Sequence, residues 1–125
     1  MNIAILGAGM VGRTMALDLA TNHTVTSFDL SEKNLELLHS KNNQIICKQA
    51  NLGDYAAYTT LLAPYDYIVL AVPGFMGYNA LEAVIKAGKN TVDISFFPED
   101  ALALDALAKE KQVTVITDCG VAPGM

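Results

Sequence analysis

The chain has 125 residues, of which 52% are hydrophobic, and a formal net charge of −5 at pH 7. This length supports one compact core and leaves little for a second, so a single domain over 1–125 is expected. The negative charge argues against nucleic acid or an anionic membrane as the partner, because both would repel the chain. A small diffusible ligand fits better.

The sequence predicts neither a membrane span nor a secretory signal. The longest uncharged stretch, 67–81, falls short of the roughly 20 residues of a spanning helix, and Pro73 interrupts it. The N-terminus has no cationic lead and no cleavage site. Cys47 and Cys119 stand 72 positions apart without a CxxC. This spacing favours neither a zinc site nor a disulfide framework, and it favours a reducing cytoplasm as the location.

Short apolar runs alternate with segments of helical periodicity along the chain. Six runs, each bounded by Gly, Pro, Asn or Asp, predict strands. They cover 2–6, 24–29, 44–48, 67–72, 91–95 and 113–118. Such alternation indicates βαβ units. We therefore expect an α/β Rossmann fold, with a doubly wound six-stranded parallel sheet of order 3-2-1-4-5-6 and helices on both faces.

Five helical segments are predicted between the strands. In the first, 10–21, the apolar residues Val11, Met15 and Leu19 recur every fourth position on one face. Ser31 directly precedes the second segment and is predicted to be its N-cap.

A glycine-rich loop joins the first strand to the first helix. Gly7 is expected to allow the tight turn, Gly9 to let a pyrophosphate approach the backbone, and Gly12 to permit close packing of the helix on the strand. The diphosphate would then lie on the free amides at the helix start. A GxGxxG alone is a weak signal, but this one follows a predicted strand and opens a predicted helix. The residues predicted to bind a dinucleotide here are Gly7, Ala8, Gly9, Met10, Val11 and Gly12.

Asp29 ends the second predicted strand, 22 residues after Gly7. An acid at this place accepts hydrogen bonds from the adenosine ribose hydroxyls. It also disfavours the 2′-phosphate of NADP, by about 1 to 4 kcal/mol at 4 Å. Lys33, the nearby cation, lies in a predicted helix, where a lysine is more often solvated. NAD is therefore the preferred cofactor, with NADP possible. For Arg13 two roles stay open, contact with a phosphate oxygen or surface ion pairing.

In a doubly wound sheet, ligands lie across the carboxyl ends of the strands. Asn51 follows the third predicted strand, and either an adenine contact or a role as a turn residue is open for it. Ala71, Val72 and Pro73 end the fourth and are expected to line the ribose and nicotinamide side. Met76 is expected to pack in the core or in a loop.

The catalytic residues stay unknown. Asp93 lies inside the fifth predicted strand, where a buried structural role competes with a catalytic one, and Asp118 and Cys119 are candidates only by position. His23 and His39 do not recur with metal-ligand spacing, so no metal site is predicted. None of the five tyrosines is followed four residues later by a lysine. The missing spacing argues against the short-chain dehydrogenase arrangement.

Whole phrases of the sequence resemble the saccharopine dehydrogenase family, including its lysine dehydrogenase-like members. The phrases are ILGAGMVGRTMALDLA at 5–20, AVPGFMGYNALEAVIKAGKNTVDISFFPED at 71–100 and DCGVAPGM at 118–125. The glycine loop is generic, whereas the short sequences at 73–75, 93–96 and 120–124 are more specific to the family.

This resemblance implies an NAD(P)-dependent oxidoreductase that acts on a carbon–nitrogen bond of an amino acid, with this chain as its cofactor-binding domain. It also implies a C-terminal domain, beyond the loop at 120–124, that supplies most substrate contacts and a homodimer interface. Without that domain, the chain is not expected to be catalytically competent. Some saccharopine-forming members carry an acidic residue where this chain has Ala122, which leaves the substrate open.

Two other functions stay open. The ligand-gating domains of potassium transport systems also begin with a GAGxVG loop, so an NAD(H)-sensing regulatory domain is one alternative. The segment 73–100 discriminates, because a sensor has no reason to keep its proline–glycine turn and aromatic-rich loop. An epimerase-like domain with bound NAD is the other, and the missing Tyr-x-x-x-Lys weakens it.

Overall fold

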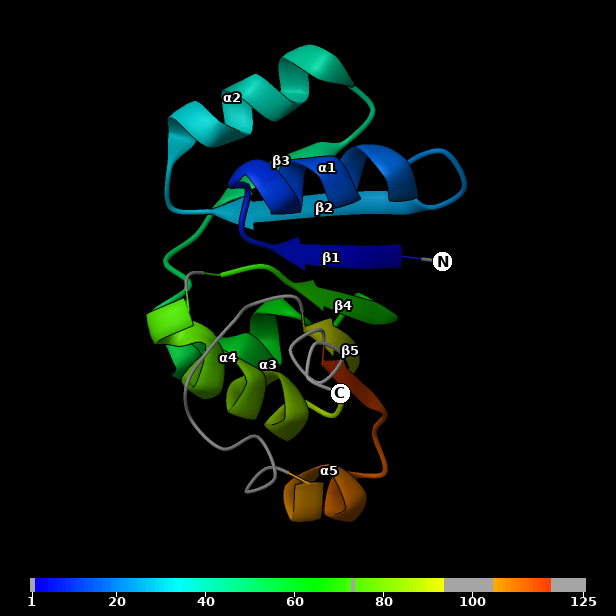
Figure 1. The fold of residues 1–125 in the computed structure, drawn as a ribbon, viewed down its shortest axis with the longest axis vertical. Coiled ribbons are helices and arrows are strands. Elements are labelled where there is room, and N and C mark those ends of the chain that lie inside the picture. Colours follow the sequence, from blue (N-terminus) through cyan, green and yellow to red (C-terminus); the bar gives the residue numbers. More distant parts are fainter. Residues whose placement is uncertain (1, 73, 94–104, 118–125) are drawn as a thin grey trace, which may run out of the picture.

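A computed structural model of the chain describes residues 2–72, 74–93 and 105–117. Figure 1 shows strands and helices alternating along the chain. The elements are β1 (Asn2–Leu6), α1 (Met10–Leu19), β2 (Thr24–Asp29), α2 (Glu32–Lys41), β3 (Ile46–Gln49), the 3-10 turn η1 (Tyr55–Ala57), α3 (Tyr58–Leu61), β4 (Tyr67–Leu70), α4 (Gly74–Lys86), β5 (Asn90–Asp93), α5 (Asp105–Lys111) and β6 (Val115–Thr117).

The strands form one parallel sheet of order β3-β2-β1-β4-β5-β6. The predicted α/β Rossmann-like parallel sheet with helices is confirmed. The chain runs outward from β1 to β3 and then crosses back to β4, so the strand order reverses between β1 and β4. In Figure 1 the first turns of α1, α2 and α4 gather at the edge where the arrowheads of β1, β2 and β4 end. This reversal is the place where such sheets bind ligands.

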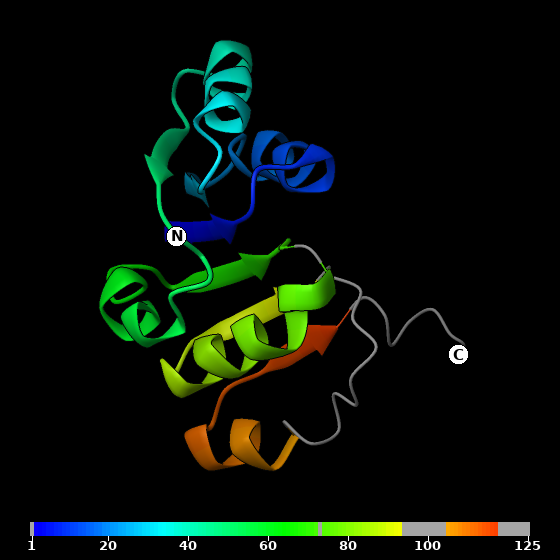
Figure 2. The ribbon, with the colours of Figure 1, turned by 90° about the vertical axis from the view of Figure 1, so that its left-hand side faces the viewer.

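Helices cover the sheet on both sides. Ile3 and Ile5 of β1 point into one buried cluster, with Ala16 of α1 and Leu38 of α2. Ala4 and Leu6 point the other way, into a larger cluster with residues of α3, α4 and α5. Figure 2 shows α1 and α2 on one side of the strands and α3 and α5 on the other. Because both faces of β1 are buried, its sequence is a continuous apolar run instead of an alternating one.

Strand β3 begins two residues later than predicted. Asn42 explains the shift, because its side-chain Oδ1 accepts the N–H of Gln44 at 3.0 Å and its backbone carbonyl accepts that of Ile45 at 3.2 Å. These bonds hold 44–45 in a turn.

Three other predicted strands also have different bounds. Strand β5 begins at Asn90, one residue earlier than predicted. Strand β4 ends at Leu70, although the N–H of Ala71 still donates to the Leu6 carbonyl at 2.8 Å. The start of β6 is delayed because the N–H of Thr114 bonds the side chain of Asn90 at 2.7 Å. The predicted strand ends at 94–95 and at 118 lie outside the described residues.

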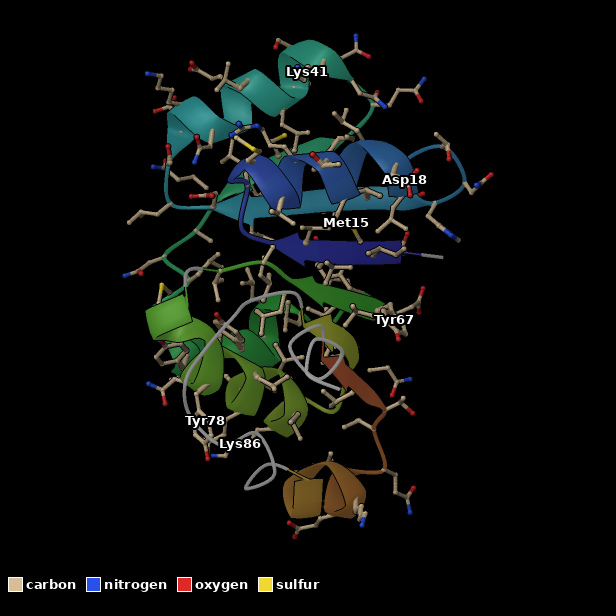
Figure 3. The ribbon with its side chains drawn as sticks, in the orientation of Figure 1. Met15, Asp18, Lys41, Tyr67, Tyr78 and Lys86 are labelled. Atoms are coloured by element: carbon tan, nitrogen blue, oxygen red, sulfur yellow. The ribbon has the colours of Figure 1, made fainter. Side chains whose placement is uncertain are left out.

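The amino-end edge of the sheet carries an apolar hollow of about 250 Å³. Met15 of α1 and Tyr67 of β4 line it on the face that α1 covers (Figure 3), together with Val92 of β5.

Nothing in the described chain resembles a membrane span, since its longest helix, α4, has only 13 residues.

Tyr58 connects α3 to the loop after β3 through a hydrogen bond, and removal of its hydroxyl tests this contact. Its hydroxyl donates to the Leu52 carbonyl at 2.7 Å, and the residue is 1% exposed. We expect Tyr58→Phe to lower the free energy of unfolding by about 1 to 2 kcal/mol, because it leaves a buried carbonyl without its partner. Urea denaturation measures this, and Tyr55→Phe, on a half-buried ring, is the matched control. Equal effects of the two variants would contradict the assignment.

The same hydroxyl makes stability depend on pH. Burial raises the pKa of Tyr58, and repulsion from Tyr55 adds to it. A raised folded-state pKa gives stability that is complete below the unfolded pKa of about 10 and is lost as pH rises above it. The difference in unfolding free energy between the wild type and Tyr58→Phe should therefore narrow above about pH 10.

Candidate functional site

A cleft of about 640 Å³ opens at the carboxyl edge of the sheet, where the strand order reverses. Its walls come from the loop between β1 and α1, the start of α2, the loop after β3, and the region between β4 and α4. Nine residues predicted to bind cofactor line it together: Gly7, Gly9, Met10, Val11, Gly12, Asp29, Asn51, Ala71 and Val72.

Two glycines of the loop are required by the chain itself. Gly7 has a φ of +113°, and a Cβ there would collide with the carbonyl oxygen of Ala71 and lie 2.8 Å from its carbonyl carbon. A Cβ on Gly12 would collide with the carbonyl oxygen of Gly7 and lie 2.9 Å from its carbonyl carbon. Both contacts are with backbone, which cannot rotate away. Gly7 and Gly12 therefore let α1 pack tightly on the ends of β1 and β4.

Gly9 differs from both. Its φ of −71° suits any residue, and a Cβ there would meet nothing within 4 Å. The fold therefore gives no reason for a glycine at this position. The space that a side chain would fill lies on the wall of the cleft, where it is free for a ligand to approach the backbone.

The start of α1 is open, whereas that of α2 is closed by its own side chains. The N-cap of α1, Gly9, makes no side-chain bond, and the first turn holds no acidic residue. On α2, Ser31 accepts the N–H of Asn34, and Glu32 lies in the first turn. The first N–H groups of a helix lack internal partners and attract anions. The start of α1 in the cleft therefore has neither a capping side chain nor an acidic residue in its own first turn.

Apolar side chains gather around the cleft. In the described part of the chain, five large apolar side chains are exposed, and three of them line it: Met10 at 78%, Val11 at 58% and Leu30 at 60%. Large exposed apolar surface is uncommon outside binding sites. The cleft thus combines an anion-attracting end with apolar walls.

Asp29 uses both carboxylate oxygens to hold the backbone of the site. One accepts the N–H of Ala8 at 2.6 Å, and the other accepts the N–H of Ser31 at 2.8 Å. These bonds connect the glycine loop to the turn before α2. Each oxygen keeps a further lone pair, so the carboxylate can still accept from a ligand.

Arg13 spans the same two segments. Its Nη1 donates to the Ala8 carbonyl at 2.9 Å and to Oδ1 of Asn34 at 3.3 Å. Both acceptors are neutral, so the surface ion pair left open for Arg13 does not form among the described contacts.

The loop after β3 forms another wall. Oδ1 of Asn51 accepts the N–H of Gly53 at 3.0 Å, and its backbone carbonyl accepts that of Asp54 at 3.1 Å. Asn51 is therefore a turn residue, one of the two roles left open for it. It also lines the cleft, so its amide hydrogens can still face a ligand.

Other predicted residues fall elsewhere. Ala8 is buried, and its N–H is taken by Asp29. Pro73, Asp118, Cys119 and the side chain of Asp93 lie outside the described residues. Six residues that were not predicted to bind also line the cleft: Leu30, Asn34, Leu52, Gly53, Tyr55 and Met76.

Metal and thiol chemistry receive no support from the described residues. They contain no group of three or more His, Cys, Asp or Glu side chains that could hold a metal ion. Cys47 lies on β3, and burial raises the pKa of its thiol, which favours the protonated form.

Sequence comparison identifies one matching family. The family model of the saccharopine dehydrogenase NADP-binding domain matches residues 3–116. Among curated proteins, Protein CapL of Staphylococcus aureus is 31% identical over 78 residues, which make up 58% of this chain and 18% of that protein. The chain thus spans less than a fifth of this relative.

Solved structures share the fold over almost the whole chain. Saccharopine dehydrogenase (L-Glu forming) from Saccharomyces cerevisiae has a TM-score of 0.82 and 22% identity, covering 98% of this chain and 28% of its own. Biliverdin reductase from Synechocystis, in complex with biliverdin and NADP⁺, has a TM-score of 0.74 and 18% identity over 93% of this chain and 37% of its own. The WlbA dehydrogenase from Thermus thermophilus, in complex with NAD and α-ketoglutarate, has a TM-score of 0.71 and 20% identity. The match covers 94% of this chain and 40% of that one.

Proposed function

Because the chain belongs to the family of saccharopine dehydrogenase NADP-binding domains, we propose that it is the cofactor-binding domain of an oxidoreductase and holds NAD(H) in the cleft between β1 and β4. The observation that carries this proposal is Gly9. A glycine without a structural reason stands at the open start of a helix, on the wall of the cleft at the carboxyl edge of the sheet. A pyrophosphate approaching the backbone gives that reason.

The residues around the cleft suit the parts of a dinucleotide. The first turn of α1 would hold the pyrophosphate, Asp29 would accept from the adenosine ribose, and Met10, Val11 and Leu30 would pack against flat ring surfaces. When bound, the nicotinamide supplies hydride transfer, while the protein supplies position and electrostatics. The apolar walls would also keep water from the bound rings.

The finer function rests on the resemblance to the family. We propose that the parent protein acts on a carbon–nitrogen bond of an amino acid, in the cytoplasm and as a homodimer. The chain covers 28% of the yeast saccharopine dehydrogenase, which leaves room for a substrate domain in such a protein. Asp93, Asp118 and Cys119 stay candidates for catalysis. The segment 73–100, which discriminates an enzyme from a sensor, falls inside the family match.

We further propose that NAD is preferred over NADP. Asp29 lines the cleft, and its carboxylate makes no ion pair with Arg13 among the described contacts. Repulsion between this carboxylate and a 2′-phosphate about 4 Å away would make the binding free energy of NADP less favourable by about 1 to 4 kcal/mol. The two cofactors seen with the structural neighbours, NADP⁺ and NAD, show that this fold accommodates either in those proteins.

Asp29→Ala tests the proposed function. We expect NADH binding to weaken and the ratio of the NADPH to the NADH dissociation constant to fall by about tenfold or more, because the repulsion is removed. The ratio matters because losing the bonds to Ala8 and Ser31 loosens the site for both cofactors alike. Fluorescence titration of NADH and NADPH measures both constants.

Asp18→Ala is the matched control. It removes the same charge from an exposed position on α1, at the end of the helix away from the glycine loop (Figure 3). Its ratio should equal that of the wild type. An unchanged ratio in Asp29→Ala would remove Asp29 from cofactor selection.

A further inference from the structure

Asn34 lies in the first turn of α2 and lines the cleft beside Asp29. Its backbone N–H bonds the N-cap Ser31 at 3.2 Å, which fixes its place at the start of the helix. Its side chain is partly buried and receives one hydrogen bond, from Nη1 of Arg13 at 3.3 Å.

The chemistry of arginine determines which way the Asn34 amide faces. A guanidinium has donors and no acceptor, so only the oxygen of the amide can face Arg13. The Nδ2 group therefore faces away from Arg13, and its two hydrogens have no acceptor among the described residues. A residue on the wall of the cleft thus carries an oriented, unused donor.

This donor complements the neighbouring carboxylate. Asp29 can only accept, and the Asn34 amide nitrogen can only donate. A hydroxyl group both donates and accepts, so it matches this pair better than a phosphate does, because a phosphate would face the Asp29 charge.

We propose that Asn34 is a second recognition residue for the adenosine ribose, donating from Nδ2 to a ribose hydroxyl oxygen, and that Arg13 is the positioning residue that orients it. This rests on the proposed function, because it requires a dinucleotide in the cleft. Arg13 reaches the Ala8 carbonyl and Asn34 with the same nitrogen, so it also fixes α2 relative to the glycine loop.

The first test compares Asn34→Ala with Asn43→Ala by titration calorimetry with NAD⁺. Asn43 is exposed and lies outside the cleft, so it is the matched control. We expect Asn34→Ala to weaken binding about three- to tenfold, the size of one neutral hydrogen bond. With an NAD⁺ analogue that lacks both hydroxyls of the adenosine ribose, the wild type and Asn34→Ala should bind equally. Asn34→Leu, which keeps the branched shape of the side chain but not its polar atoms, should behave like Asn34→Ala.

A double-mutant cycle tests the role of Arg13. If Arg13 acts through Asn34, the effects of Arg13→Ala and Asn34→Ala on the NAD⁺ dissociation constant do not multiply in the double variant. Arg13→Lys should restore only part of the affinity, because a lysine lacks the planar guanidinium geometry. Multiplying effects would overturn the positioning role.

The outcomes separate this inference from the proposed function. If the wild type binds NAD⁺ and Asn34→Ala has the same NAD⁺ dissociation constant, the role of Asn34 is overturned and the proposed function is left intact. An equal loss in Asn34→Ala for NAD⁺ and for the analogue without hydroxyls would also overturn it. No binding of NAD⁺ by the wild type would overturn both.

Discussion

Gly12→Ala is expected to lower the free energy of unfolding by about 3 kcal/mol. The added Cβ would overlap the carbonyl oxygen of Gly7 and lie 2.9 Å from its carbonyl carbon. Relief requires α1 to move away from β1, which opens the cluster around Ile5 and Ala16. A domain with a total stability of about 5 to 15 kcal/mol loses a large part of it. The melting temperature should fall by roughly 10 °C.

Urea denaturation and thermal unfolding measure this effect, and Gly9→Ala is the control. It makes the same substitution three positions earlier, at the N-cap of α1, where a Cβ meets nothing within 4 Å. Its unfolding free energy should stay within about 1 kcal/mol of the wild type. A Gly12→Ala variant as stable as Gly9→Ala would show that the packing of α1 on the loop is looser than the structure describes.

Gly9→Val is expected to keep the fold and to abolish measurable NADH binding. Its φ of −71° is open to any residue, and the side chain would enter free space. That space is where the pyrophosphate must approach the first N–H groups of α1. A branched side chain there would hold the anion away from the helix. Gly9→Ala, with a smaller side chain, should weaken binding by about tenfold.

Titration with NADH measures the loss of binding in Gly9→Val, and circular dichroism checks that the variant keeps its fold. Gly53→Ala is the companion variant on another wall of the same cleft, where the added Cβ would approach only the side chain of Asn51, at 3.2 Å. We expect it to change NADH affinity far less than Gly9→Val. If Gly9→Val bound NADH as tightly as the wild type, the glycine loop would not be the pyrophosphate site.

The fold and the glycine loop could be predicted because local residue types carry them. Continuous apolar runs such as 3–6 predict strands buried on both faces, and their alternation with helices predicts a parallel sheet. Gly7 and Gly12 stand where the backbone approaches too closely for a Cβ. Their spacing in the sequence reflects that local geometry.

Asn34 and Tyr55 could not be predicted in the same way. Asn34 reaches the site through its contact with Arg13, 21 residues earlier, which exists only once α2 lies beside the glycine loop. Tyr55 depends on the path of the loop that crosses back toward β4. Neither carries a local pattern, because asparagine and tyrosine are common in ordinary turns and helices. The bonds of Asp29 to Ala8 and Ser31 also depend on the folded turn.

The central claim is that the open cleft at the glycine loop holds a dinucleotide with an unphosphorylated ribose. Titration calorimetry of the 125-residue chain with NADH, and separately with NADPH, tests it most directly. We predict saturable binding of NADH at one site, with NADPH about tenfold or more weaker. No heat with either cofactor, or tighter binding of NADPH, would contradict the account.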